Sequence, residues 1–201
     1  MKKLVLILFA GISFATANAQ FQVGIKAGAN FSTLTDNQGY SDRTLFNFNA
    51  GAFAQFPLAH FVALQPELVY SGQGSRYPDN VTGGMISQHQ NYINVPLLLK
   101  LKSRYGVYVE TGPQIGFLTS ASLKEGGNSA DWSSNVSSAD FAWVFGFGYK
   151  VPLSPIGIDL RYNLGISNTL NNNSAVSDNY SVRNDVFQIG LTCVLFSAGR
   201  R

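Results

Sequence analysis

Five charged residues have types and spacing that could act together in one place: Lys26, Glu67, Glu110, Asp159 and Arg161. Each stands on the polar side of a segment in which polar and apolar residues alternate, at a similar distance from one end of that segment. If the segments are neighbouring strands, the charges share one layer. Basic groups facing carboxylates can form a paired network, whereas buried charges of a single sign would be prohibitively costly. We therefore favour a structural network of ion pairs over catalysis by the carboxylates.

The histidines offer the other chemistry open to this chain. A nucleophile or general base most often involves His with a carboxylate and Ser. We place His60 in a short turn and His89 at the opposite end of a strand, so the two cannot act together. His89 with Ser87 or Ser71 is the remaining combination, and no carboxylate accompanies it. We therefore expect no catalytic site, and a lipid-modifying enzyme is the less favoured alternative.

Metal, cofactor and nucleic-acid sites are not predicted. The sequence has no His/Cys cluster, and its scattered Asp residues lack the spacing of a calcium loop. Cys193 is the single cysteine of the chain, so no internal disulfide can form. Without Lys2 and Lys3, 12 of the 14 Lys and Arg residues remain against 11 Asp and Glu. This near-neutral balance leaves no electrostatic footprint for nucleic acid.

Residues 1–19 have the pattern of a secretory signal peptide. Two lysines precede a short apolar run, and small residues end it at Ala17-Asn18-Ala19. A membrane-spanning helix needs about 20 apolar residues, and this run is much shorter. We expect cleavage before Gln20 and a single domain over residues 20–201.

Strict alternation of apolar and polar residues is the main structural signal of that domain. Between Phe21 and Phe31 every second residue is apolar, and a period of two is typical of a strand with two unlike faces. The pattern predicts eight strands, an even number as in single-chain bacterial barrels. They cover residues 21–34, 44–57, 61–73, 89–101, 105–119, 139–151, 156–168 and 184–196.

The connections between the predicted strands alternate between long and short. The short ones are 58–60, 102–104 and 152–155; the long ones, rich in Ser, Asn, Asp and Gly, are 35–43, 74–88, 120–138 and 169–183. All long loops then lie at one end of a barrel, and all short turns at the other end with both termini. Outer-membrane barrels have this arrangement, with long extracellular loops and short periplasmic turns.

The residue sizes on the two faces indicate which face points outward. In 139–151 the apolar set is large and aromatic, while the opposite set includes Gly146 and Gly148. Large side chains would crowd a narrow interior, so the apolar face belongs against lipid and the polar face inside. The sequence thus predicts an all-β, eight-stranded antiparallel up-and-down transmembrane β-barrel, with an interior filled by side chains and no wide pore. A soluble lipocalin-like carrier is the structural rival.

Three prolines fall inside predicted strands: Pro66, Pro96 and Pro113. Proline cannot donate a ladder hydrogen bond, and a closed barrel has no edge strand to accommodate it. We expect β-bulges at these positions.

Three stretches resemble the PorT-type outer-membrane β-barrel family. They are Asn91-Tyr-Ile-Asn-Val-Pro-Leu-Leu-Leu-Lys, Tyr108-Val-Glu-Thr-Gly-Pro-Gln-Ile-Gly-Phe-Leu and Gly157-Ile-Asp-Leu-Arg-Tyr-Asn-Leu-Gly-Ile-Ser-Asn. The resemblance implies an OmpA- or OmpX-like eight-stranded barrel in the outer membrane of a Gram-negative cell, with periplasmic termini. A member of that family assists protein secretion, but no residue here identifies a secretion contact.

The favoured function is therefore a small, porin-like but non-enzymatic outer-membrane barrel with a plugged polar interior. Its expected partners are outer-membrane lipid and proteins that contact the extracellular loops or periplasmic turns. Exposed aromatic residues are candidate anchors for such contacts, and the candidates are Tyr40, Tyr77, Trp132 and Tyr180. The alternative is an accessory subunit of a secretion or envelope complex.

Overall fold

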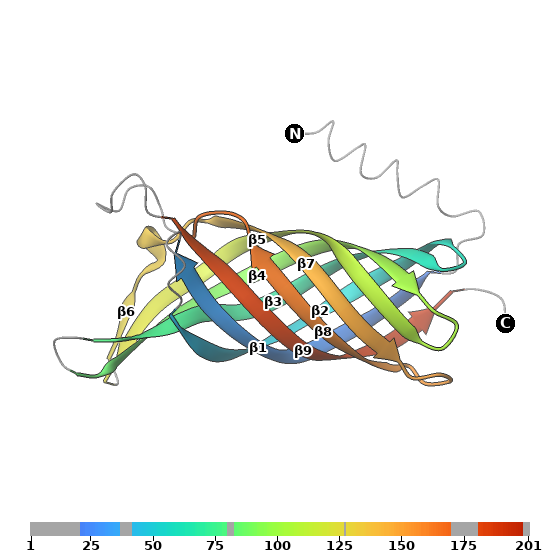
Figure 1. Cartoon of the computed structure of the whole chain (residues 1–201), viewed down its shortest axis with the longest axis horizontal. Coiled ribbons are helices and arrows are strands. Elements are labelled where there is room, and N and C mark those ends of the chain that lie inside the picture. Colours follow the sequence, from blue (N-terminus) through green and yellow to red (C-terminus); the bar gives the residue numbers. More distant parts are fainter. Residues whose placement is uncertain (1–20, 37–41, 80–82, 127, 170–180, 199–201) are drawn as a thin grey trace, which may run out of the picture.

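Eight long antiparallel strands form a closed ring in the computed structural model, which describes residues 21–36, 42–79, 83–126, 128–169 and 181–198. The strands are β1 (Gln22–Asp36), β2 (Arg43–Ala59), β3 (Val62–Pro78), β4 (Met85–Lys102), β5 (Val107–Glu125), β7 (Ala139–Lys150), β8 (Ile156–Gly165) and β9 (Val182–Ser197). Neighbours in the ring are neighbours in the sequence, and β1 pairs with β9 to close it (Figure 1). The predicted eight-stranded up-and-down barrel is confirmed.

The ring has two unlike ends. At one end, which we call the turn end, β1 begins, β9 ends, and short turns join β2 to β3, β4 to β5 and β7 to β8. The turn before β5 needs Gly106, whose φ of 90° is a conformation that L side chains rarely adopt. We call the opposite end, where the long connections lie, the loop end.

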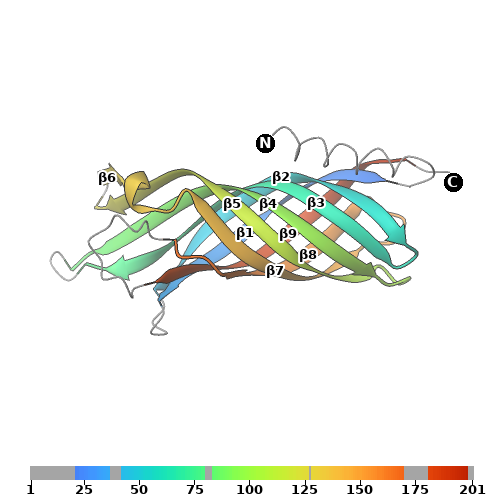
Figure 2. The same cartoon turned by 90° about the horizontal axis from the view of Figure 1, so that it is seen from above.

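Three strands continue past the ring at the loop end, where we had predicted loops. β3 runs on to Pro78 and β4 already begins at Met85, while β5 continues to Glu125 and pairs with the short strand β6 (Asn128–Asp131). Figures 1 and 2 show this projection on the side where β6 is labelled. The segments are too polar to alternate clearly, but they satisfy one another's backbone groups, as in the pair Tyr77 and Ile86. The predicted loops 74–88 and 120–138 are therefore partly strand.

The outer surface of the ring is apolar and the interior is polar. Along β8 exposed and buried residues alternate without a break, with Ile158 47% exposed and Arg161 only 3% exposed. The large residues of β7 also face outward, Phe145 at 51% and Phe147 at 52% exposure. The interior of this barrel therefore holds mainly charged and amide side chains, with a few buried apolar ones such as Leu98 and Val144 among them.

The strand prolines do not produce bulges, so that prediction is wrong. The register of β3 with β4 is the same on both sides of Pro66, and the register of β5 with β7 does not change at Pro113. Glu67 falls opposite Pro96 within a short interruption of the β3–β4 ladder. Proline has no backbone N–H to donate, and the ladders are interrupted where that donor would be needed. Register shifts occur elsewhere, as between Asn91 and Tyr92.

Candidate functional site: an ion-pair cluster inside the barrel

Six charged side chains meet inside the barrel, nearer the turn end. We call them the ion-pair cluster: Lys26 of β1, Glu67 of β3, Lys100 of β4, Glu110 of β5, and Asp159 and Arg161 of β8. Their side chains are between 0% and 8% exposed. Because inward positions on neighbouring strands lie at one level, residues far apart in the sequence form a single layer.

Arg161 is the centre of the cluster. Its Nη1 and Nη2 donate hydrogen bonds of 2.7 and 2.8 Å to the two carboxylate oxygens of Glu67. This parallel pair is the strongest geometry for a guanidinium with a carboxylate. Its Nε also lies 2.6 Å from Glu110 Oε1 and 2.8 Å from Asp159 Oδ2, as ion-pair contacts without hydrogen-bond alignment. One guanidinium thus faces three carboxylates.

The two lysines complete the pairing on either side of Arg161. Lys26 Nζ donates to Asp159 Oδ2 at 3.1 Å and lies 3.7 Å from Glu67 Oε2. Lys100 Nζ lies 3.4 Å from Glu110 Oε2 and 3.5 Å from the centre of the Tyr108 ring. Each carboxylate therefore has at least one ammonium group as well as Arg161 within ion-pair distance.

Lys100 is the member of the cluster that sequence reasoning missed. The five residues singled out from the sequence comprise two bases and three acids, and Lys100 brings the cluster to neutrality. The run of leucines before it hides the alternation, because Leu98 is completely buried while Leu97 and Leu99 are 45% and 41% exposed. The signal that could have found Lys100 is its position two residues after Leu98, on the same inward face.

Glycines on β7 make room for the cluster. A Cβ atom added at Gly146 would lie 2.6 Å from Glu110 Cγ, and one at Gly148 would collide with the Tyr108 ring. The close approach of Glu110 and Tyr108 therefore requires residues without side chains at these inward positions.

A layer of amide and hydroxyl groups covers the cluster on the side of the loop end. Asn30 Nδ2 donates to Ser71 Oγ at 2.9 Å, and Asn30 Oδ1 accepts from Asn49 and Gln188 at 2.6 and 3.0 Å. Gln73 donates to Ser71 at 2.9 Å. Each of these side chains is at most 6% exposed. Cluster and amide layer together fill the middle of the barrel with paired polar groups.

The histidine and serine positions do not assemble a nucleophile and base. Ser71 is buried inside the barrel, whereas His89 lies on the outward face of the loop-end projection. Burial lowers the pKa of His89, and the nearby cations of Lys124 and Arg76 lower it further. His60 lies in a turn at the opposite end and packs edge-on against Phe61.

Two of the four candidate contact residues, Tyr77 and Trp132, lie among the described residues at the loop end. Tyr77 lies near the end of β3, where burial and the carboxylates of Asp42, Glu125 and Asp79 raise its pKa. Trp132 follows β6 and donates its backbone N–H to Ala121. Tyr40 and Tyr180 lie outside the described residues.

Some kinds of site are absent from the described residues. The described residues contain no group of three or more His, Cys, Asp or Glu that could hold a metal ion. No helix among them is long and apolar enough to cross a membrane.

Comparison with known proteins gives one family match and several similar folds. Residues 13–171 match the family model described as outer membrane protein beta-barrel domain. The crystal structure of Neisserial surface protein A (NspA) has a TM-score of 0.58 at 14% identity, covering 85% of this chain and 96% of that one. The attachment invasion locus protein Ail of Yersinia pestis has a TM-score of 0.44 at 15% identity, covering 87% and 99%. CarO of Acinetobacter baumannii has a TM-score of 0.42 at 12% identity, covering 86% and 97%. No curated protein sequence matches significantly.

Proposed function

Because the chain belongs to the outer membrane protein beta-barrel domain family and is an outer-membrane β-barrel protein, we propose that it is a non-enzymatic barrel with a sealed interior. In this proposal its loop-end projection contacts partners outside the cell, and its turn end faces the periplasm. The observation that carries the proposal is the pairing of all six cluster charges at the level where an open channel would need water. The family match concerns the barrel domain in general, so the secretion role implied by the PorT-type resemblance stays a prediction.

The sealed interior has a direct consequence for ion conduction. An eight-stranded barrel is just wide enough to be filled by its own side chains, and here those side chains neutralise one another. We expect the folded protein in a planar lipid bilayer to give no large, stable conductance steps. Folding before reconstitution is checked by the gel mobility of heated and unheated samples. Stable steps that recur in independent preparations would contradict a sealed barrel.

The projection supports contacts on the side of the loop end. The β3–β4–β5 ladder and β6 extend a hydrogen-bonded surface beyond the ring, and all four residues of β6 are exposed. The outer side of β6 carries no further strand in the described sheet order, so its backbone groups face outward. Such an edge can pair with an extended segment of a partner.

Orientation in the membrane can be tested by labelling single cysteines. Starting from Cys193→Ala, one variant carries Ser129→Cys in β6 and another carries Tyr105→Cys in the turn before β5, where Tyr105 is 82% exposed. We expect a membrane-impermeant maleimide to label Ser129→Cys in intact cells. Tyr105→Cys should react only after the outer membrane has been permeabilised. The opposite pattern would place the turn end outside the cell.

A further inference from the structure

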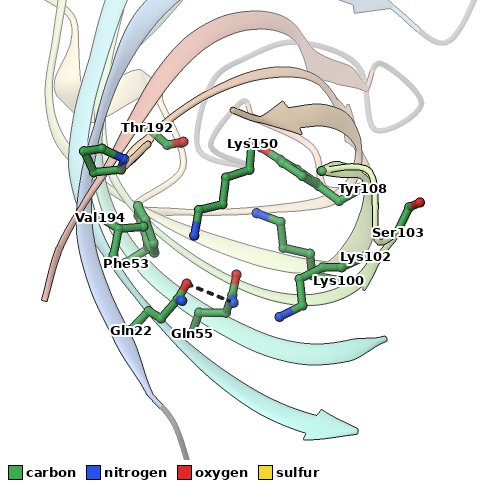
Figure 3. A pocket seen from close by; sticks show the side chains of 12 residues that line it. Gln22, Phe53, Gln55, Lys100, Lys102, Ser103, Tyr108, Lys150, Thr192 and Val194 are labelled. Carbon is green, nitrogen blue, oxygen red and sulfur yellow. Dashed lines mark hydrogen bonds between the residues drawn. The ribbon is translucent and has the colours of Figure 1, made fainter. Parts of the chain in front are cut away.

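A pocket of about 130 Å³ opens at the turn end, next to the ion-pair cluster. Figure 3 shows the side chains of Lys100, Lys102 and Lys150 extending into it from the ends of β4 and β7. Gln22 and Gln55 lie on the opposite wall and are joined by a hydrogen bond of 3.4 Å. Cationic and amide groups from β1, β2, β4 and β7 thus line part of the pocket.

Two of these lysines carry charges that the described part of the chain does not neutralise. Lys100 belongs to the ion-pair cluster and faces Glu110. By contrast, the ammonium groups of Lys102 and Lys150 make no ion pair or hydrogen bond with any described residue. Both side chains are half-buried, and Lys150 is the charged group that repels Lys102. Two like charges thus share one partly enclosed space.

The distribution of carboxylates leaves this positive charge unopposed. Outside the ion-pair cluster, every described Asp and Glu lies toward the loop end: Asp36, Asp42, Asp79, Glu125, Asp131, Asp140 and Asp185. The described turn end carries Lys102, Arg104 and Lys150 and no carboxylate. A cleft lined by one sign of charge and surrounded by low-dielectric walls focuses the field and concentrates counter-ions. The described charges at the mouth of the barrel therefore attract anions.

We propose that the turn-end pocket binds a phosphate group between the ammonium groups of Lys102 and Lys150. No arginine lines this pocket, and the ammonium group of lysine binds phosphate as a compact point charge with three donors. A phosphate monoester carries about −1.5 to −2 charges near pH 7, which fits two lysines. The Gln22 and Gln55 amides supply further hydrogen-bond donors at the wall.

The phosphate can come from two sources. Inorganic phosphate or a soluble monoester brings nearly two charges, whereas the headgroup of a phospholipid is a diester with about one. Two ammonium groups side by side balance two negative charges better than one, so the pocket favours the first source. The neutral cluster next to the pocket contributes no net charge that would repel either one.

Titration with inorganic phosphate tests the proposal on the full chain in a maltoside detergent, which carries no phosphate. We expect saturable binding by isothermal titration calorimetry, weakened at least about tenfold in Lys102→Gln/Lys150→Gln, because hydrogen bonds to charged groups are lost. Arg104→Gln is the matched control: it removes a positive charge from the same turn, but Arg104 does not line the pocket and lies over the Phe61 ring. Its affinity should stay within about twofold of the wild type.

The soluble diester glycerophosphoglycerol, used as a competitor, distinguishes the two sources. If it competes only at higher concentration than inorganic phosphate, the site is one for free phosphate or a monoester; if it competes at lower concentration, the site is one for a lipid headgroup. No saturable binding by the wild type, or an equal loss in Arg104→Gln and in the double variant, would overturn the proposal. The gel mobility of each variant before heating establishes that the barrel has folded. Because the measurement is made in detergent, it does not depend on the orientation proposed above.

Discussion

Replacement of Arg161 by Met should lower the free energy of unfolding by about 3–5 kcal/mol, the usual cost of removing one partner from a buried ion pair. Methionine keeps an unbranched side chain in the space but removes both hydrogen bonds to Glu67 and the charge facing Glu110 and Asp159. Three buried carboxylates would then face two lysines. Urea denaturation of the protein in lipid vesicles, followed by the fluorescence of Trp132 and Trp143, measures the difference.

A second substitution separates the charge imbalance from the loss of packing. In Glu67→Gln/Arg161→Met the cluster keeps two carboxylates, Glu110 beside Lys100 and Asp159 beside Lys26. We expect this double variant to be more stable than Arg161→Met alone, because its buried charges balance again. If Arg161→Met stays within about 1 kcal/mol of the wild type, the cluster is not what holds the interior together.

The strands of the ring were predictable because each has one face against an apolar surrounding and one against a polar interior. That difference imposes a period of two on the sequence, and β7 and β8 display it without a break. The projection at the loop end lacks this constraint. Its strands have similar surroundings on both faces, so segments such as 85–88 resemble a loop although they pair as strand.

The charged layer was partly predictable for a related reason. Lys26 and Arg161 stand alone among small or apolar neighbours, so their inward position is evident from the alternation. Lys100 follows three leucines of which the middle one also points inward, and residue type alone does not separate the faces there. The effect of the prolines on strand pairing could not be predicted. The backbone accommodates them through gaps in the hydrogen-bonded ladders, and such gaps leave no trace in the hydrophobic pattern.

An arginine at the centre of the outward row of β7 should destabilise the protein more than one near its end. Phe145 stands midway along the outward row that runs from Phe141 to Tyr149, and its side chain is 51% exposed on the apolar surface. A charged residue at the middle of the bilayer costs a transmembrane barrel about 2–4 kcal/mol, but only about 0–1 kcal/mol near the interface. We therefore expect Phe145→Arg to lose about 2–4 kcal/mol of unfolding free energy in lipid vesicles.

Tyr149→Arg is the matched control on the same strand and the same face, one residue before β7 ends at the turn end. An arginine there can extend its side chain to the headgroup region, so its cost should stay near the interfacial value. The comparison cancels the loss of an aromatic ring, because both substitutions remove one. Equal costs at the two positions would mean that the cost does not depend on depth. The apolar surface of β7 would then be covered by something other than lipid.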